Sequence, residues 1–294
     1  MKRHLSLNVI SNSVSPFQGR GFGPQRDTSQ GILCQVILVL GFLTGSTVPS
    51  PVLAQGEAPQ QPVAIHQDWD ALLRESVVGS QVDYSGLKTK IGRLETYLGL
   101  LAETDPSTLS DTARLAFWIN TYNAVTVKMI LDHFPGIASI RDIDDPWGER
   151  RVTINGRSLS LDDIEHKIIR AEFEEPRIHF AVNCASKGCP DLLGEAFVAE
   201  HLDDQLSRVT QSFLADATKG ARAGLVKGKL WGETPTLTLS PILKWYAGDF
   251  QKNGSTVSSF VAIYAPKDVG KFVSEHSGDL KLGYFDYDWS LNGP

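Results

Sequence analysis

Apolar residues recur at helical spacing over several long segments of the chain and alternate with polar residues over only a few short ones. Helical spacing predicts helices over residues 69–77, 88–101 and 202–217. Ser110 is a predicted N-cap for a further helix, which continues through His133 and is ended by Pro135 and Gly136. Ser160, with Asp163 three residues later, predicts the start of another helix over residues 161–173.

The predicted strands are short. Asn155 and Gly156 predict a tight hairpin turn between residues 151–154 and 157–159. Further strands are expected at residues 82–84, 176–183, 236–239 and from 284 onward. Ser240 and Pro241 then predict a helix start, since proline fits the first helical position. Helices outweigh these strands, so we expect a single α+β domain, rich in helix, whose short strands are mostly antiparallel.

The first part of the chain has the pattern of an export signal. In residues 1–54, basic residues precede an apolar core at about 32–43, and small residues follow up to Ala54. The core is shorter than the roughly 20 residues of a membrane-spanning helix, so we expect cleavage after Ala54 and no retained membrane span. A flexible linker is expected over residues 55–66 and one domain over 67–294. We expect a periplasmic or secreted protein.

Net charge narrows the class of partner. The chain has a formal charge of −6, and the predicted signal removes more basic than acidic residues. Nucleic-acid binding depends on clustered Lys and Arg, so nucleic acid is not an expected partner. We expect an unknown small molecule, a peptide or a glycan instead, and no cofactor.

Five segments, in this order, resemble the domain-of-unknown-function 547 family. They are AFWINTYNAVTV at residues 116–127, LSLDDIEHKIIR at 159–170, RIHFAVNCASKGCP at 177–190, LKWYAGDF at 243–250 and YDWSLN at 287–292. The similarity extends over about residues 69–292. It implies an exported protein among bacterial members and, in plant members, a domain joined to coiled-coil segments; it implies no particular reaction.

The helix after Ser110 carries candidate polar and aromatic site residues. Asn120 and Asn123 are three residues apart and share one face, and Trp118 and Tyr122 share an adjacent face. The two carboxamides are candidates for positioning a substrate or stabilising an oxyanion. The alternative is that they bond to neighbouring loop backbone, as buried Asn side chains usually do.

The segment at residues 176–190 holds Cys184 and Cys189, the two cysteines that remain after removal of Cys34 with the signal. In a strand, Arg177 and His179 would share one face and Cys184 would lie on the other, about 16 Å from His179. The candidate substrate-binding residues are Trp118, Tyr122, Arg177 and His179, although an arginine at the position of Arg177 more often pairs with a carboxylate than binds a substrate anion.

Three alternatives for the cysteines stay open. In the first, Cys184 is a nucleophile, His166 accepts its proton and Asn120 or Asn123 assists, as in a cysteine-dependent hydrolase or acyl transferase. In the second, Cys184 and Cys189 form a disulfide in a non-enzymatic binding domain. The third, a metal site, lacks the usual ligand spacing, so we expect no metal.

The aromatic residues near the end of the chain have two interpretations. Trp245, Tyr246 and residues 284–289, with Asp286 and Asp288, could form a wall that stacks on sugars. Large rings more often fill a hydrophobic core, and we expect most of these to be buried.

Overall fold

The computed structural model describes residues 62–227 and 232–294. The predicted signal and most of the predicted linker lie outside the described residues. The described chain begins with helix α1 (Pro62–Ile65), and the side chain of His66 is buried against Tyr97. The last residues of the predicted linker are therefore part of the folded unit.

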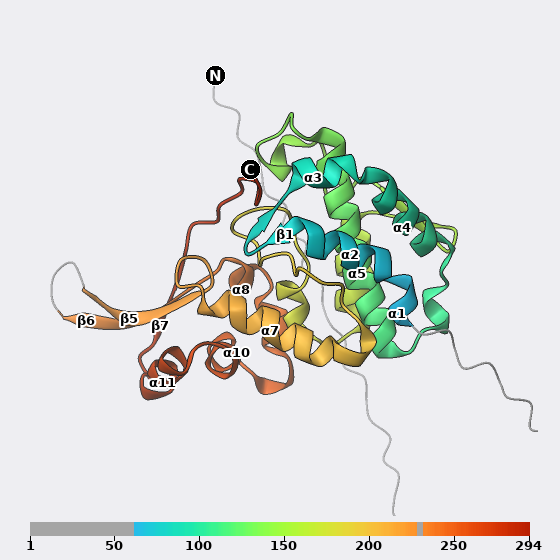
Figure 1. The fold of residues 1–294 in the computed structure, drawn as a ribbon. Helices are drawn as coiled ribbons and strands as arrows, with labels where there is room; N and C mark the ends of the chain where they lie inside the picture. The colour runs from blue at the N-terminus through green and yellow to red at the C-terminus, as the bar shows by residue number, and fades with distance from the viewer. Residues whose placement is uncertain (1–61, 228–231) are drawn as a thin grey trace, which may run out of the picture. The chain divides into compact units, whose positions relative to one another are not determined.

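The fold is α+β, and its most buried element is helix α5 (Asp111–His133). The Ser110 side chain accepts a hydrogen bond from the Ala113 backbone N–H at 3.3 Å, which confirms the predicted N-cap. Helices α3 (Tyr84–Thr89) and α4 (Ile91–Glu103) pack on α5, and α2 (Gln67–Ser76) packs on α4. Apolar side chains along the whole of α5 are buried, and Figure 1 shows α2, α3 and α4 lying around this helix.

The predicted hairpin and helix start at residues 151–163 are confirmed. Strands β3 (Val152–Ile154) and β4 (Arg157–Leu159) pair antiparallel around a turn in which Asn155 and Gly156 both have positive φ. Ser160 and Asp163 then exchange two side chain to backbone hydrogen bonds of 3.0 and 3.1 Å. The helix that follows is a π-helix, η3 (Asp163–Ile169), continued by α6 (Arg170–Glu172).

The predicted strand over residues 176–183 is wrong. Pro176 opens a 3-10 helix, η4 (Pro176–Phe180), and the Glu175 side chain accepts a hydrogen bond from the Arg177 backbone N–H. Ile178, His179 and Phe180 are all buried, so the apolar run packs in the core without alternating faces. A 3-10 helix rises about 2 Å per residue, whereas a strand rises about 3.3 Å. The separation of about 16 Å between His179 and Cys184, which was estimated for a strand, therefore does not apply.

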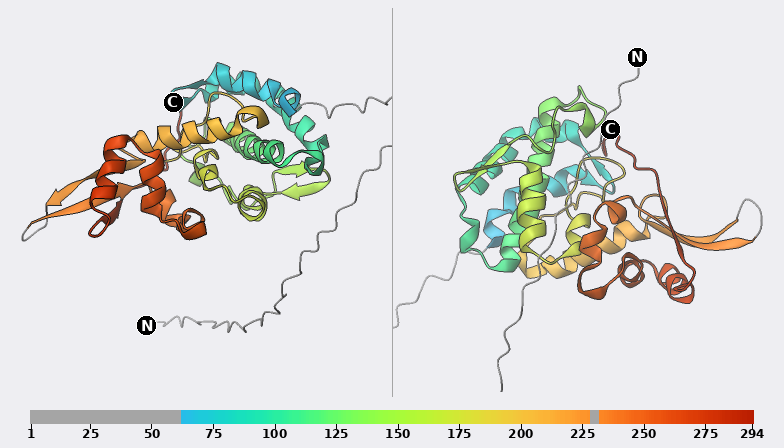
Figure 2. Two further views of the ribbon diagram at one scale, coloured as in Figure 1. Left: turned by 90° about the horizontal axis from the view of Figure 1, so that it is seen from below. Right: turned by 180° about the vertical axis from the view of Figure 1, so that it is seen from behind.

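The second half of the chain combines helices with a three-stranded sheet. Helix α7 (Leu202–Ala215) precedes strands β5 (Ala221–Lys227) and β6 (Glu233–Leu239), which pair antiparallel. Strand β7 (Lys281–Tyr284) adds to β6 in parallel. It ends at Tyr284, the residue at which the predicted strand was expected to begin. Figure 2 shows β5 and β6 extending beyond the helices.

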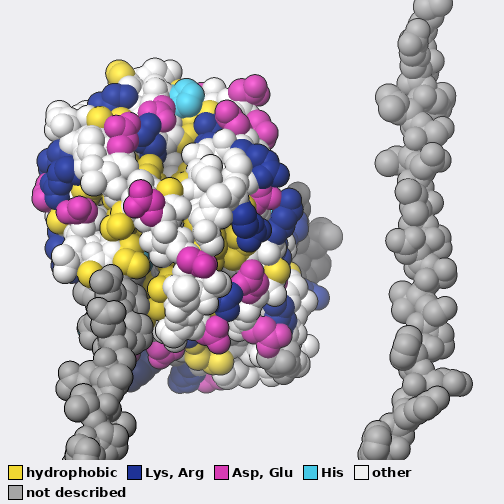
Figure 3. Space-filling model, turned by 90° about the vertical axis from the view of Figure 1, so that its right-hand side faces the viewer, with side chains coloured by type: hydrophobic (Ala, Val, Ile, Leu, Met, Phe, Trp, Pro, Cys, Tyr) yellow, Lys and Arg dark blue, Asp and Glu magenta, His cyan; other side chains and the backbone are white. Residues whose placement is uncertain are grey.

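The other elements are short. They are β1 (Val77–Val78), β2 (Gln81–Val82), η1 (Pro106–Thr108), η2 (Ile140–Asp142), η5 (Ala199–His201), α8 (Ile242–Trp245), α9 (Ala247–Phe250), η6 (Lys252–Gly254), α10 (Val257–Tyr264) and α11 (Lys267–Glu275). On the face drawn in Figure 3, basic and acidic side chains are interspersed. Within residues 62–227 and 232–294, no helix has both the length and the apolar composition that a membrane crossing requires.

Candidate active site

The two asparagines of α5 hold two different loops. The Asn123 side chain donates to the Ala181 carbonyl at 2.9 Å and accepts from the Asn183 N–H at 2.8 Å. Asn120 forms the same pair of bonds with the backbone of Phe197, at 2.7 and 3.0 Å. Both asparagines are buried and bonded to backbone, as in the second of the two interpretations above. Asn123 positions the backbone directly before Cys184.

The end of the described chain fixes the other side of the cysteine loop. The backbone N–H groups of Lys187 and Gly188 donate to the carbonyls of Ser290 and Asp288 at 2.9 and 2.8 Å. A Cβ atom on Gly188 would lie 2.9 Å from the Asp288 backbone nitrogen, so glycine is required for this close approach. The loop is therefore held on one side by α5 and on the other by residues 288–292.

Within this loop the two cysteine sulfur atoms lie 2.8 Å apart as free thiols. Cys184 Sγ also lies 3.1 Å from Ser186 Oγ and 3.2 Å from Tyr287 Oη. The hydrogen bond from the Cys189 thiol, followed by those from Ser186 and Tyr287, lowers the pKa of Cys184 despite its burial. Burial raises the pKa of Cys189. Cys184 is thus the sulfur that ionises first, and Cys189 remains its hydrogen-bond donor.

His179 is a buried imidazole with one free nitrogen. Its Nε2 lies 2.8 Å from Asp249 Oδ2, and the ring stacks on Tyr246 with 4.0 Å between centroids. Because a carboxylate only accepts, Nε2 carries the proton and Nδ1 presents a lone pair. Nδ1 is buried and has no hydrogen-bond partner among the described residues. Burial lowers the pKa of His179, so the ring is neutral near pH 7.

Asp249 is held ionised opposite this imidazole. The hydrogen bond from His179, with a second one from Arg170 Nε at 2.6 Å, holds the pKa of Asp249 well below its usual range. The carboxylate thereby fixes both the tautomer and the orientation of His179.

The two thiols and the His179 imidazole lie along the wall of one pocket of about 220 Å³. Cys184, Cys189 and His179 line it together with the predicted site residues Tyr122 and His166. The remaining lining residues are Trp147, Asp162, Glu165, Val182, Ile242, Trp245, Tyr246, Tyr287 and Trp289. The pocket combines a thiol of lowered pKa, a neutral imidazole with a free nitrogen and a largely aromatic wall.

His166 lines the same pocket as the two thiols. Its side chain is 39% exposed at the pocket, and its Nδ1 lies 3.1 Å from Arg170 Nη1. Within the described part of the chain, the hydrogen bonds of Cys184 reach neither His166 nor His179. The buried imidazole of the pocket is His179.

Two of the predicted substrate-binding residues do not line this pocket. Trp118 is buried against Phe117, with the rings edge to face. Arg177 pairs with Glu175 and Asp203 at 2.6 and 2.8 Å, as one of the two interpretations of this residue had it.

The expected aromatic wall is formed in part. Trp245, Tyr287 and Trp289 contact one another at centroid distances of 4.5 to 6.0 Å, and they line the pocket. Asp286 and Asp288 are exposed and do not line it. Instead, Asp288 accepts hydrogen bonds from the backbone and hydroxyl of Ser290.

Sequence reasoning missed Asp249, and it included Tyr287 in the aromatic wall without pairing it with Cys184. Both lie within segments that carry the family resemblance, LKWYAGDF and YDWSLN. Each is far along the chain from its partner, since Asp249 lies 70 residues after His179 and Tyr287 lies 103 residues after Cys184. The family segments were the available signal, although their spacing did not indicate which of their residues meet.

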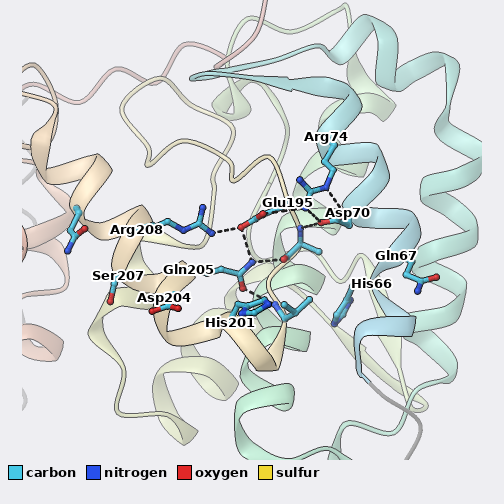
Figure 4. A pocket seen from close by; sticks show the side chains of 13 residues that line it. His66, Gln67, Asp70, Arg74, Glu195, His201, Asp204, Gln205, Ser207 and Arg208 are labelled. Carbon is cyan, nitrogen blue, oxygen red and sulfur yellow. Dashed lines mark hydrogen bonds and ion pairs between the residues drawn. The ribbon is translucent and has the colours of Figure 1, made fainter.

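A larger cavity of about 820 Å³ lies between α2 and α7 (Figure 4). Its charged groups pair with one another: Arg74 bonds Asp70 at 2.7 Å and Glu195 at 3.3 Å, and Arg208 also bonds Glu195. Because these charges offset one another, the cavity offers less to a ligand than the pocket with the thiols. Across residues 62–227 and 232–294, no three His, Cys, Asp or Glu side chains are grouped so as to hold a metal ion.

Comparisons with known proteins give one match. The model of a family described as "Protein of unknown function, DUF547" matches residues 106–214, the part that contains α5, His179 and both thiols. Neither the comparison with curated proteins nor that with solved structures gives a match. Residues 106–214 are therefore similar to the DUF547 family.

Proposed function

We propose that this chain is a cysteine-dependent hydrolase or acyl transferase in which Cys184 is the nucleophile and His179, oriented by Asp249, accepts its proton. One observation carries the proposal. A thiol whose pKa is lowered lines the same pocket as a buried neutral imidazole, which has a carboxylate on one nitrogen and, among the residues that the structure describes, no hydrogen-bond partner on the other. A nucleophile, a base and a group that orients the base are the parts that acyl transfer through a thiol requires.

The proposed reaction has two steps. His179 Nδ1 takes the Cys184 proton, and the sulfur attacks the acyl carbon; the bond to the leaving group breaks, and the leaving group receives the proton from the imidazole. Water or another nucleophile then attacks the thioester and transfers its proton to His179; the C–S bond breaks, and the imidazolium returns the proton to the released thiolate. Tyr287 Oη, 3.2 Å from Cys184 Sγ, is the donor placed to stabilise the oxyanion of each step.

The test uses p-nitrophenyl acetate, a small neutral acyl donor, with release of nitrophenolate and intact mass as readouts. We expect a stoichiometric burst with acetylation of Cys184, no burst in Cys184→Ala, and acetylation slowed about 100-fold or more in His179→Gln. His166→Gln should slow acetylation far less. Circular dichroism and urea unfolding show that each variant is folded. Acetylation of folded Cys184→Ala at the same rate, or equal losses in His166→Gln and His179→Gln, would contradict the assignment.

The second candidate function is a non-enzymatic binding domain with a Cys184–Cys189 disulfide. The 2.8 Å separation of the sulfur atoms favours it, because only a small movement is needed for bond formation. Alkylation of protein purified without reductant separates the candidates. Two accessible thiols support the enzyme, whereas two thiols that react only after reduction support the binding domain.

We further propose that the protein is exported to the periplasm or secreted. The support is the pattern of residues 1–54, with basic residues before a short apolar core and small residues up to Ala54. N-terminal sequencing of the protein recovered from the exported fraction of a producing cell should begin at Gln55. Recovery of the full-length chain from the cytoplasmic fraction alone would refute this proposal.

A further inference from the structure

We propose that the pocket beside Cys184 selects substrates that carry a cationic ammonium group close to the acyl carbon. This inference rests on the proposed function, since it names the substrate class of the same site. It is carried by the arrangement of aromatic rings and of two carboxylates along the pocket wall, none of whose lining residues in the described part of the chain is Lys or Arg.

Four aromatic residues form a cluster in the pocket wall. Trp289 contacts Trp147, Trp245 and Tyr287 with ring centroids 5.9, 6.0 and 4.5 Å away. All four line the pocket, with Tyr246 on another part of the wall. Trp245 is 51% exposed, so this aromatic cluster is open to an entering ligand. Several ring faces around one small space are a common way to bind an ammonium group, because each ring face is electronegative.

The pocket wall also carries acidic side chains. Asp162 and Glu165 both line the pocket, and no Lys or Arg is among its lining residues. In the described part of the chain, their ion pairs are with His166 alone, at 3.6 and 3.8 Å. The Glu165 side chain is only 8% exposed, so its charge is poorly hydrated. A cation entering the pocket would gain from both carboxylates, and an anion would be repelled.

Two arginines contact rings of the wall without lining the pocket: Arg141, whose guanidinium carbon lies 5.4 Å from the centroid of the Trp289 ring, and Arg170. Arg170 bonds Asp249 at 2.6 Å and lies 4.9 Å from the centroid of the Tyr246 ring. Arg170 also attracts Glu165, so it offsets part of the negative charge of the wall, while Asp249 in turn offsets part of the charge of Arg170. The volume of about 220 Å³ is below the roughly 300–1,000 Å³ of pockets that hold drug-sized ligands. It suits a single lysine-like side chain or a compact ammonium compound.

The test measures the charge preference of Cys184 with two methanethiosulfonate reagents of similar size. One carries a trimethylammonium-ethyl group and the other a sulfonate-ethyl group. Each transfers its alkylthio group to the Cys184 thiolate, forming a disulfide and releasing methanesulfinate, so no acyl chemistry is needed. The protein carries Cys189→Ser, which prevents a second thiol from displacing the adduct. The preference of the protein is the rate with the cationic reagent divided by the rate with the anionic reagent. It is compared with the same ratio measured for 2-mercaptoethanol.

We expect the protein to prefer the cationic reagent at least fivefold more strongly than 2-mercaptoethanol does. Glu165→Gln should reduce this preference by about three- to tenfold, because it removes a carboxylate from the wall. Glu275→Gln, which makes the same charge change on α11 outside the pocket, should leave the preference unchanged. Taking a ratio of reagents cancels any change in the ionisation of Cys184, which affects both rates equally.

The outcomes separate this inference from the proposed function. A preference equal to that of 2-mercaptoethanol, or equal reductions in Glu165→Gln and Glu275→Gln, overturns the cation selectivity. Acetylation of Cys184 by neutral p-nitrophenyl acetate would stand in either case. Conversely, a strong cationic preference without acetylation refutes the acyl chemistry and leaves an ammonium-binding pocket.

Discussion

Replacing Asn123 by alanine should damage both the stability of the fold and the reactivity of Cys184. Asn123 satisfies one buried backbone N–H and one buried carbonyl in the segment before the thiol. An unsatisfied buried group costs about 1–3 kcal/mol, so the loss of both should lower the free energy of unfolding by about 2–6 kcal/mol. The better helix propensity of alanine offsets up to about 0.7 kcal/mol of this.

Asn120→Ala is the matched control, since Asn120 makes the same pair of bonds to Phe197 from the same helix. Its loss should cost a similar free energy of unfolding without displacing the backbone next to Cys184. Urea unfolding followed by circular dichroism measures the stability of both variants, and an unchanged slope shows that the transition is comparable.

Iodoacetamide alkylation of folded protein, without urea, measures the reactivity of Cys184 across pH. We expect Asn123→Ala to shift the pH midpoint of alkylation upward, because the thiol loses its alignment with Cys189 and Tyr287. Asn120→Ala should keep the midpoint of the unsubstituted protein. The reasoning fails if both variants shift the midpoint equally, or if Asn123→Ala unfolds at the same urea concentration as the unsubstituted protein.

Three further predictions concern separate parts of the molecule. Burial lowers the pKa of His66 to about 4, so below about pH 6.5 the unfolded state binds more protons than the folded state, and the free energy of unfolding decreases as the pH is lowered. Between pH 7 and pH 5 the protein should lose about 2 kcal/mol more of this free energy than His66→Asn does, as measured by urea unfolding. Cys189→Ala should raise the pH midpoint of Cys184 alkylation, and Cys189→Ser should restore part of the shift, whereas equal midpoints in all three proteins would argue against the thiol hydrogen bond. Gly156→Ala should destabilise the protein by about 1 kcal/mol, because φ is +75° at this residue. Gly99→Ala, on the exposed side of α4, should stabilise it by about 0.5–1 kcal/mol, and thermal unfolding shows whether the two variants shift the midpoint in opposite directions.

Elements with a strong local signal could be predicted from sequence. The start of α5 depends on the Ser110 side chain, and the hairpin depends on two residues, Asn155 and Gly156, that readily adopt positive φ. The reciprocal bonds of Ser160 and Asp163 lie within four consecutive residues. In each case the residues that form the contact are neighbours in the chain, so spacing alone is informative.

The cysteine segment shows why local pattern fails elsewhere. Alternating apolar residues at 176–183 favour a strand, but this segment has no strand partner and its backbone is bonded by Asn123 of α5. The same limit applies to the site. Cys184 and His179 were candidates because of their residue types, whereas the pairing of His179 with Asp249 depends on packing between η4 and α9, which sequence spacing does not encode.

The contacts made by the last described residues have a consequence for biosynthesis. Asn292 donates to Asn183 Oδ1, 109 residues earlier, and accepts a hydrogen bond from the Tyr84 hydroxyl. Ser290 and Asp288 hold the backbone on the other side of the thiols. A ribosome-bound chain therefore cannot complete the cysteine loop until synthesis has passed Asn292, and a nascent chain stalled before that point would carry both thiols in an unfinished, unprotected setting.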